Sequence, residues 1–137
     1  TLFPYTTLFR SARIAQVYAA DACFKDPFND VCGLAAIESV FRHMYQQVLD
    51  PWFRVTHSMG EGGEAWLAWE FRFRFRGWRA GEVQCIRGAT HLCFASDGRV
   101  ASHRDYWDTC EELFVRLPLV GALVGWLRRR LAAPQGR

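Results

Sequence analysis

The sequence predicts an α+β domain, because helical patterns come first and strands joined by short turns follow. Apolar residues recur at three- and four-residue steps over 34–49, which indicates one face of an amphipathic helix. Within the segment 64–76, apolar and charged residues alternate from Trp69 to Arg76, which is typical of an antiparallel strand with one buried face. Asp97-Gly98 is a strong signal for a hairpin between two further strands.

Short elements precede the long helix. Residues 12–20 are rich in alanine and favour a helix, and residues 22–26 predict a brief strand. Pro27 ends this strand, and a loop is predicted over 28–33. Pro51 ends the long helix, because the residue before a proline avoids helical backbone angles.

Four strands make up the predicted sheet, and two helices close the chain. Turns that contain glycine separate the first three strands, and a two-residue turn joins the last two. In the strand over 64–76 the apolar side chains point to one face and the arginines to the other, because successive side chains alternate across a strand. The other strands are predicted over 52–59, 82–94 and 99–108, and the helices over 109–117 and 119–131.

Composition limits the class of protein. Of the 137 residues 50% are hydrophobic and 15% aromatic, which is enough for one core. We therefore expect one domain over 12–131 and a tail over 132–137.

Charge limits the class of partner, because the formal net charge is only +3. Glutamates also lie close to the stripe of Arg72, Arg74 and Arg76, so we expect a solvated or dimer-facing surface and no nucleic-acid partner. No apolar run reaches the roughly 18 residues of a membrane span.

The cysteines and histidines show no metal or disulfide pattern. The spacings of the five cysteines match no zinc or Cys-x-x-Cys motif, and their number is odd. No stretch has the charged start, apolar middle and small-residue cleavage site of a secretory signal, so we expect free, mostly buried thiols in a reducing cytoplasm. We also expect no metal site, because no two histidines share a face with a third ligand. The cysteines are Cys23, Cys32, Cys85, Cys93 and Cys110.

The first eleven residues, TLFPYTTLFRS, look foreign to the rest of the chain. They carry no helical or alternating pattern that continues into Ala12. They resemble translated sequencing-adapter read-through, so we interpret residues 1–11 as a non-native segment. On this interpretation the native first helix is longer, whereas the alternative is a short extended arm.

Four stretches carry recognisable motifs. They are YAADACFKDPF at 18–28, Gly33 with the helix after it, GATHLCF at 88–94 and DGRVASHRDYWD at 97–108. Together they resemble the nuclear transport factor 2-like superfamily, which includes ketosteroid isomerases, SnoaL-type polyketide cyclases and limonene-epoxide hydrolases. The resemblance covers about residues 12–117 and implies a strongly curved antiparallel sheet wrapped around N-terminal helices as a cone with a pocket. It also implies homodimers through the outer face of the sheet.

The resemblance suggests a first candidate carboxylate. Asp26 matches the general base of ketosteroid isomerases, which needs a carboxylate facing an apolar pocket. Thr90 stands where those enzymes have a protonated aspartate, and Tyr18 lies too close to Asp26 in sequence to be their donor tyrosine. The alternative is that Asp26 only shapes the turn before Pro27.

A second candidate carboxylate lies on the last predicted strand. Asp105 matches the aspartate that activates water in limonene-epoxide hydrolases, and alternation puts His103, Asp105 and Trp107 on one face. The resemblance places this face inside the cone, where a buried carboxylate must be paired or protonated. The neighbouring strand offers outward-facing Arg72 and Arg74 instead of the Arg-x-Asp of the hydrolases. The alternative is a buried polar pair that only orders the pocket.

We therefore predict a bacterial-type cytoplasmic domain with a pocket for an apolar small molecule. The first hypothesis is an enzyme of the isomerase, cyclase or hydrolase kind that needs no cofactor. Asp105 would be the acid or base, His103 its partner and Asp26 a second carboxylate. The pocket-lining residues would be Tyr18, Trp69, Phe71, Thr90 and Trp107.

Two other hypotheses remain open. The missing isomerase and hydrolase residues favour a ligand-binding or dimerisation module without catalysis. If Thr90 faces the pocket, His91, which alternates with it, faces the outer sheet surface, where we expect a dimer contact rather than catalysis. The weaker hypothesis is a peripheral membrane protein, because residues 117–130 predict an apolar helix that ends in three arginines. We expect that helix to pack on its own domain.

Overall fold

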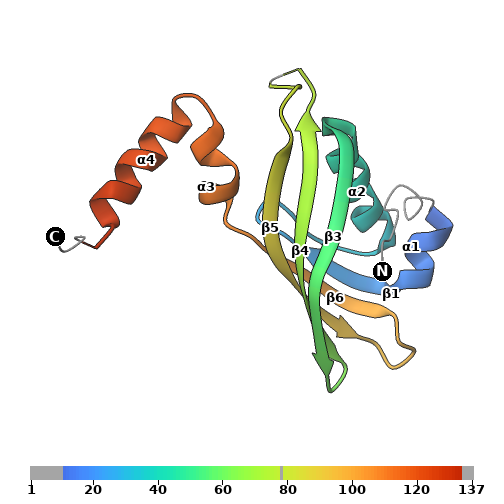
Figure 1. The fold of residues 1–137 in the computed structure, drawn as a ribbon. Helices are drawn as coiled ribbons and strands as arrows, with labels where there is room; N and C mark the ends of the chain where they lie inside the picture. The colour runs from blue at the N-terminus through green and yellow to red at the C-terminus, as the bar shows by residue number, and fades with distance from the viewer. Residues whose placement is uncertain (1–10, 78, 134–137) are drawn as a thin grey trace. The chain divides into compact units, whose positions relative to one another are not determined.

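The computed structural model describes residues 11–77 and 79–133 (Figure 1). Up to Trp107 the elements are α1 (Ser11–Val17), β1 (Tyr18–Lys25), β2 (Asp30–Cys32), α2 (Leu34–Gln47), β3 (Val48–Glu61), β4 (Glu64–Phe75), β5 (Gln84–Phe94) and β6 (Val100–Tyr106). The segment predicted to be non-native lies, except for Ser11, outside the described residues. The chain divides into two compact units, residues 1–107 and 108–137.

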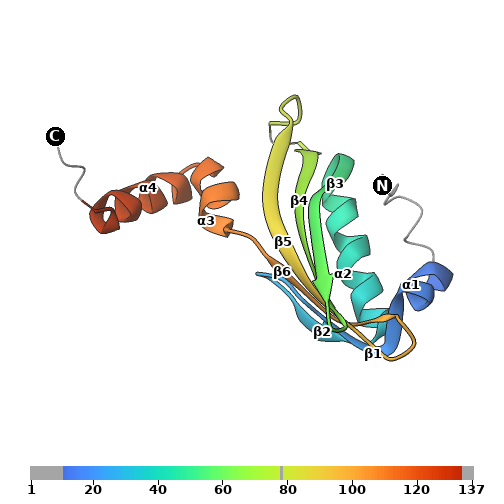
Figure 2. The ribbon, with the colours of Figure 1, turned by 60° about the horizontal axis from the view of Figure 1, so that its bottom comes forward.

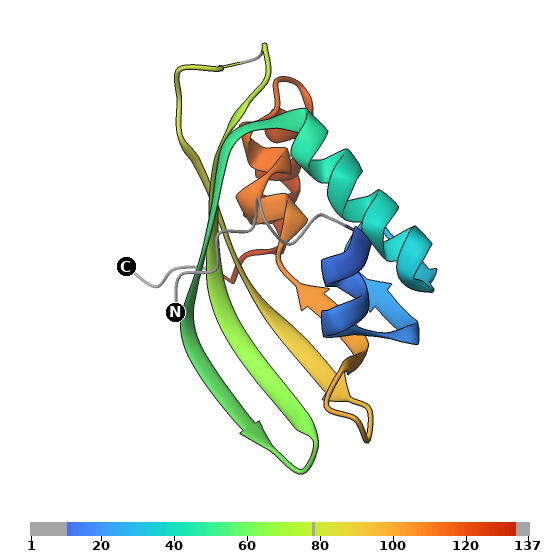
Figure 3. The same cartoon turned by 90° about the vertical axis from the view of Figure 1, so that its right-hand side faces the viewer.

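The strands form one sheet in the order β2-β1-β6-β5-β4-β3. Strands β3 to β6 pair as the predicted antiparallel meander. The sheet is strongly curved, and α1 and α2 lie on one of its faces (Figures 2 and 3). This helix-covered face is called the inner face below.

Three predictions about the N-terminal elements are wrong. The helix ends at Val17 rather than at residue 20, and Tyr18 already begins β1. Strand β1 pairs parallel with β6, so the sheet is not wholly antiparallel. The segment predicted as a loop contains β2, which pairs antiparallel with β1. Tertiary pairing overrides the local helix preference of the alanine-rich segment, because Tyr18 and Ala19 are buried in the core.

Two clusters of buried side chains fill the inner face. The first joins α1, α2, β1 and β6, and its members are Ile14, Tyr18, Ala19, Ala22, Phe24, Ile37 and Val100. The second lies on β3, β4 and β5, and its members are Val48, Trp69, Phe71, Phe73 and Ile86. The alternation predicted for β4 is confirmed in its second half, because Trp69, Phe71 and Phe73 are buried while Arg72 is exposed.

The expectation of five free, mostly buried thiols is wrong. Cys23 and Cys32 form a disulfide between β1 and β2. They lie directly opposite each other in the strand register, with their Cα atoms 4.1 Å apart. The prediction failed because it placed Cys32 in a loop, away from any strand partner. Of the free cysteines, Cys85 and Cys93 are half-buried and Cys110 is exposed.

The second unit contains α3 (Thr109–Glu112), the 3₁₀ turn η2 (Phe114–Arg116) and α4 (Val120–Leu131). The carboxylate of Asp108 caps α3 by accepting hydrogen bonds from the backbone N–H groups of Cys110 and Glu111. The predicted helix over 109–117 is thus a short helix followed by a 3₁₀ turn. Among the described residues, no helix has the length and apolar character needed to cross a membrane.

Candidate functional site

Hydrogen bonds join five side chains on the inner face into one polar network. The hydroxyl of Tyr18 lies 2.6 Å from Nδ1 of His103, and Nε2 of His103 lies 2.9 Å from Oδ1 of Asp105. The hydroxyl of Thr90 also donates to Oδ1 of Asp105. Nε1 of Trp69 donates to the Thr90 hydroxyl oxygen at 2.8 Å. The network therefore centres on the Asp105 carboxylate.

Donor chemistry gives this network a direction. An indole N–H only donates, so the Thr90 oxygen accepts from Trp69 and its own proton goes to Asp105. An ionised Asp105 then accepts from Nε2–H of His103, which leaves Nδ1 to accept from Tyr18. Among the described residues, none donates to the second oxygen of Asp105. That oxygen is therefore available to a ligand or a water molecule.

Strand register brings these residues together. Thr90 on β5 and Asp105 on β6 lie directly opposite each other, so both side chains point to the inner face. Trp69 on β4 is opposite Gly88, one inner-face position away from Thr90. A side chain at Gly88 would bring its Cβ to 2.5 Å from the Trp69 ring. The glycine thus makes room for the indole that bonds to Thr90.

The polar network lies among aromatic rings. The His103 ring is 4.8 Å from that of Phe24 and 6.4 Å from that of Phe41 on α2, centroid to centroid. It also stacks with Tyr18, and the two side chains of the His103–Asp105 pair are only 16% and 18% exposed. Low local polarity strengthens hydrogen bonds and makes unpaired polar groups costly. These surroundings suit a group that gives or takes a proton.

The structure does not bring Asp26 into this network. Its Oδ1 accepts from the backbone N–H groups of Phe28 at 2.7 Å and Asn29 at 2.6 Å. The Asn29 side-chain amide lies 3.0 Å from both carboxylate oxygens. The loop held in this way carries Phe28, whose ring meets that of Trp107 edge-on at 5.6 Å. The geometry fits the interpretation that Asp26 shapes the turn.

The other predicted pocket residues have mixed surroundings. Phe71 is 6% exposed and lies within the second core cluster, where it stacks with Phe73. Trp107 packs against the same cluster.

Two features of the site were not predicted. The hydrogen bond between Tyr18 and His103 was missed, because Tyr18 was placed at the end of a helix. Gly88 was also missed, although a glycine within a strand signals the close approach of another group.

The outer face of the sheet carries the predicted charged groups and, in addition, aromatic side chains that were not predicted there. His91 stacks on Trp66, with ring centroids 4.6 Å apart, and Trp66 stacks on Tyr106. Glu70 pairs with Arg54 at 3.1 Å and with Arg72 at 3.2 Å. Partial burial pushes the pKa of Glu70 upward, but the positive charges of Arg54, Arg72 and Arg87 together outweigh it and lower that pKa.

The comparison with protein families supports the predicted resemblance. A family profile described as a SnoaL-like domain matches residues 9–103, which is more than half of the chain. No protein of curated function resembles the sequence significantly.

Solved structures share the fold. A hypothetical protein from Catenulispora acidiphila, with a ketosteroid isomerase-like fold and bound trimethylamine, has a TM-score of 0.67 and 16% identity, over 82% of this chain and 92% of that chain. A protein from Shewanella denitrificans, proposed to be a SnoaL-like polyketide cyclase, has a TM-score of 0.63 and 20% identity, over 80% and 90%. At these identities the likeness shows the fold alone, and it confirms the predicted α+β cone.

Proposed function

This chain belongs to the SnoaL-like domain family, and we propose that it binds an apolar small molecule and acts on it by acid–base chemistry at Asp105. The observation that supports this most strongly is the polar network itself. His103 and Thr90 bond directly to one carboxylate oxygen and are themselves held by Tyr18 and Trp69, yet the other oxygen has no donor among the described residues. Such a carboxylate is oriented and ready to take a proton from a bound ligand.

His103 would act as the partner of Asp105. Its ring is held by Tyr18 on one nitrogen and by Asp105 on the other, so it can stabilise the carboxylate in either protonation state. Trp69 and Thr90 would position Asp105 from the β5 side. Asp26 has no part in this proposal, because its oxygens bond to the loop after β1.

The test uses a β,γ-unsaturated ketosteroid as probe, because its isomerisation needs only proton transfer and produces a conjugated enone that absorbs ultraviolet light. In Asp105→Asn the amide oxygen still accepts from Thr90 and His103, so the fold should survive. Turnover should fall by about 100-fold or more. Asp21→Asn, which changes an exposed aspartate on β1, is the control and should keep full turnover.

A second candidate function is ligand binding without catalysis. It is favoured by Thr90, which stands at the position of an acidic residue in the isomerases and here donates to Asp105. Saturable quenching of tryptophan fluorescence by the probe, with the probe recovered unchanged, supports this candidate. Absence of both binding and turnover counts against the ketosteroid-like ligand in either hypothesis.

We further propose that the outer sheet face joins two copies of this chain. Trp52, Trp66 and Tyr106 leave 39%, 41% and 42% of their surface exposed on that face. Aromatic side chains of this kind dominate protein interfaces. Light scattering after gel filtration should give the mass of a dimer, and Trp66→Glu should give that of a monomer.

The cytoplasmic location stays a prediction. The Cys23–Cys32 disulfide speaks against it, because such bonds persist mainly in oxidising compartments.

A further inference from the structure

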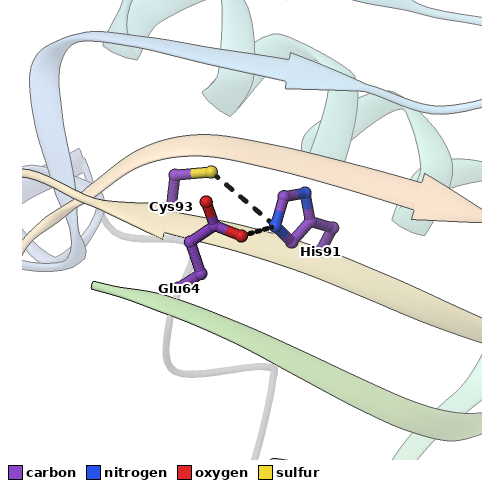
Figure 4. Close-up of side chains that lie close together, drawn as sticks. All are labelled: Glu64, His91 and Cys93. Atoms are coloured by element: carbon purple, nitrogen blue, oxygen red, sulfur yellow. Dashed lines mark hydrogen bonds and ion pairs between the residues drawn. The ribbon is translucent and has the colours of Figure 1, made fainter. Parts of the chain in front are cut away.

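Outside the polar network, three side chains of different metal-binding chemistry converge on the outer face (Figure 4). They are the carboxylate of Glu64 on β4 and the imidazole of His91 and thiol of Cys93 on β5. One ligand atom from each lies within 4.8 Å of the other two. We propose that this Glu64–His91–Cys93 cluster binds a zinc-like divalent cation, in contrast to the absence of a metal site predicted from the sequence.

Strand register fixes the cluster. Glu64 lies directly opposite Cys93, and Trp66 lies directly opposite His91. Residues 91 and 93 are two apart on one strand, so their side chains share the outer face. The Trp66 ring stacks on the imidazole at 4.6 Å and 17°, which limits how far that ligand can turn. All three ligands thus come from two paired strands, and the His91 ring is further restrained by Trp66.

The distances suit a tetrahedral ion. Nε2 of His91 lies 2.8 Å from Oε2 of Glu64 and 3.8 Å from Sγ of Cys93. Ligand atoms around tetrahedral zinc lie about 3.3–3.6 Å apart, given bonds of about 2.0–2.3 Å. A small outward movement of the exposed Glu64 side chain therefore admits the ion.

The donor set also points to the class of metal. Thiolate and imidazole favour zinc, cobalt or copper over magnesium and calcium, which take oxygen ligands. Three protein ligands leave a fourth position for water, as in open zinc sites. Metal binding requires a deprotonated thiol on Cys93 and an unprotonated Nε2 on His91, so it releases protons and affinity should rise with pH. Arg104 on β6 lies directly opposite His91 and brings a positive charge to this face of the sheet. Its guanidinium lies over the Tyr106 ring, 4.7 Å from the ring centroid.

The experiment titrates the full chain with Co²⁺, anaerobically and without reductant so that Cys23 and Cys32 stay paired. Co²⁺ replaces zinc and reports a thiolate ligand by an ultraviolet charge-transfer band, with visible bands for tetrahedral geometry. The wild type should show both at one equivalent, and added Zn²⁺ should abolish them. Cys93→Ser should remove the charge-transfer band, and His91→Gln should weaken Co²⁺ binding at least about tenfold.

Cys85→Ser is the matched control, because Cys85 lies on the same strand and is half-buried like Cys93. It should leave both bands unchanged. The proposal is overturned if the wild type shows no band up to about 1 mM Co²⁺, or if Cys93→Ser keeps the charge-transfer band. Either result would leave Glu64 and His91 as an ion pair only. Circular dichroism of each variant verifies that a lost band does not reflect unfolding.

Discussion

Trp69 and Thr90 are joined by a buried hydrogen bond of 2.8 Å between the indole N–H and the threonine hydroxyl. The two residues lie on neighbouring strands but are not directly opposite each other, since Trp69 faces Gly88 and Thr90 faces Leu67. The indole reaches its partner diagonally across the space that the glycine leaves open. Through Thr90, the apolar core of β4 is therefore coupled to the Asp105 carboxylate.

Replacing Gly88 should disturb this coupling. In Gly88→Ala the new methyl group would lie 2.5 Å from the Trp69 ring, so the indole must move and lose Thr90. Overpacking of this kind costs about 1–3 kcal/mol of unfolding free energy, measured by urea denaturation. Gly81→Ala is the control, because nothing lies within 4 Å of its added Cβ. Equal stability of the two variants would contradict the prediction.

Removing the hydroxyl of Thr90 should lower the free energy of unfolding more than removing its methyl group does. Thr90→Val keeps the shape but leaves the Trp69 N–H without its acceptor and Asp105 without one donor. An unsatisfied buried polar group costs about 1–3 kcal/mol, which chemical denaturation can measure. Thr90→Ser keeps the hydroxyl and should retain most of the stability. A larger loss in Thr90→Ser than in Thr90→Val would speak against the role of this hydrogen bond.

The charge of Glu70 should make stability depend on pH. Its pKa in the folded chain is lowered below the ordinary 4.5, since three arginines outweigh the upward effect of burial. The ionised Glu70 therefore stabilises the fold fully at pH values above its pKa in the unfolded chain. This stabilisation is lost as the pH falls through its lower pKa in the folded chain. Melting temperatures of the wild type and Glu70→Gln should differ at neutral pH and converge in acid below 4.5. Glu61→Gln, an exposed glutamate on β3, should show no such convergence.

The Cys23–Cys32 disulfide should leave three of the five cysteines free to react in the oxidised protein. Titration with a thiol reagent under denaturing, non-reducing conditions measures this number. Replacing both cysteines by serine should lower the free energy of unfolding by about 2.5 kcal/mol, from the loop entropy of a sequence separation of 9. Five reactive thiols would refute the pairing, and Cys110→Ser serves as the control for stability.

Local pattern was enough to predict the meander of β3 to β6 and the His103–Asp105 pair. The alternation over β4 and β6 depends only on the period of a strand, so the burial of Trp69 and the shared face of His103 and Asp105 could be predicted. Contacts between distant segments could not. The bond between Tyr18 and His103 spans 85 positions and depends on the pairing of β1 with β6, which no local pattern indicates.

The same distinction explains the cysteines and the outer cluster. Cys23 and Cys32 become neighbours only when β2 adds to the edge of the sheet. Glu64 approaches His91 only through the register of β4 on β5, whereas His91 and Cys93 are close along the sequence. A search limited to spacing along one strand therefore finds two of these three ligands and misses the third.

The pairing of β1 with β6 has a consequence for the order in which the chain folds. Strands β4, β5 and β6 each pair with the strand just before them along the chain, so these hairpins can form as synthesis proceeds. Strand β1 must wait for the last strand of the sheet, and contacts of such long sequence separation form slowly. The bond from Tyr18 to His103 is thus the last part of the polar network to form, when β1 meets β6.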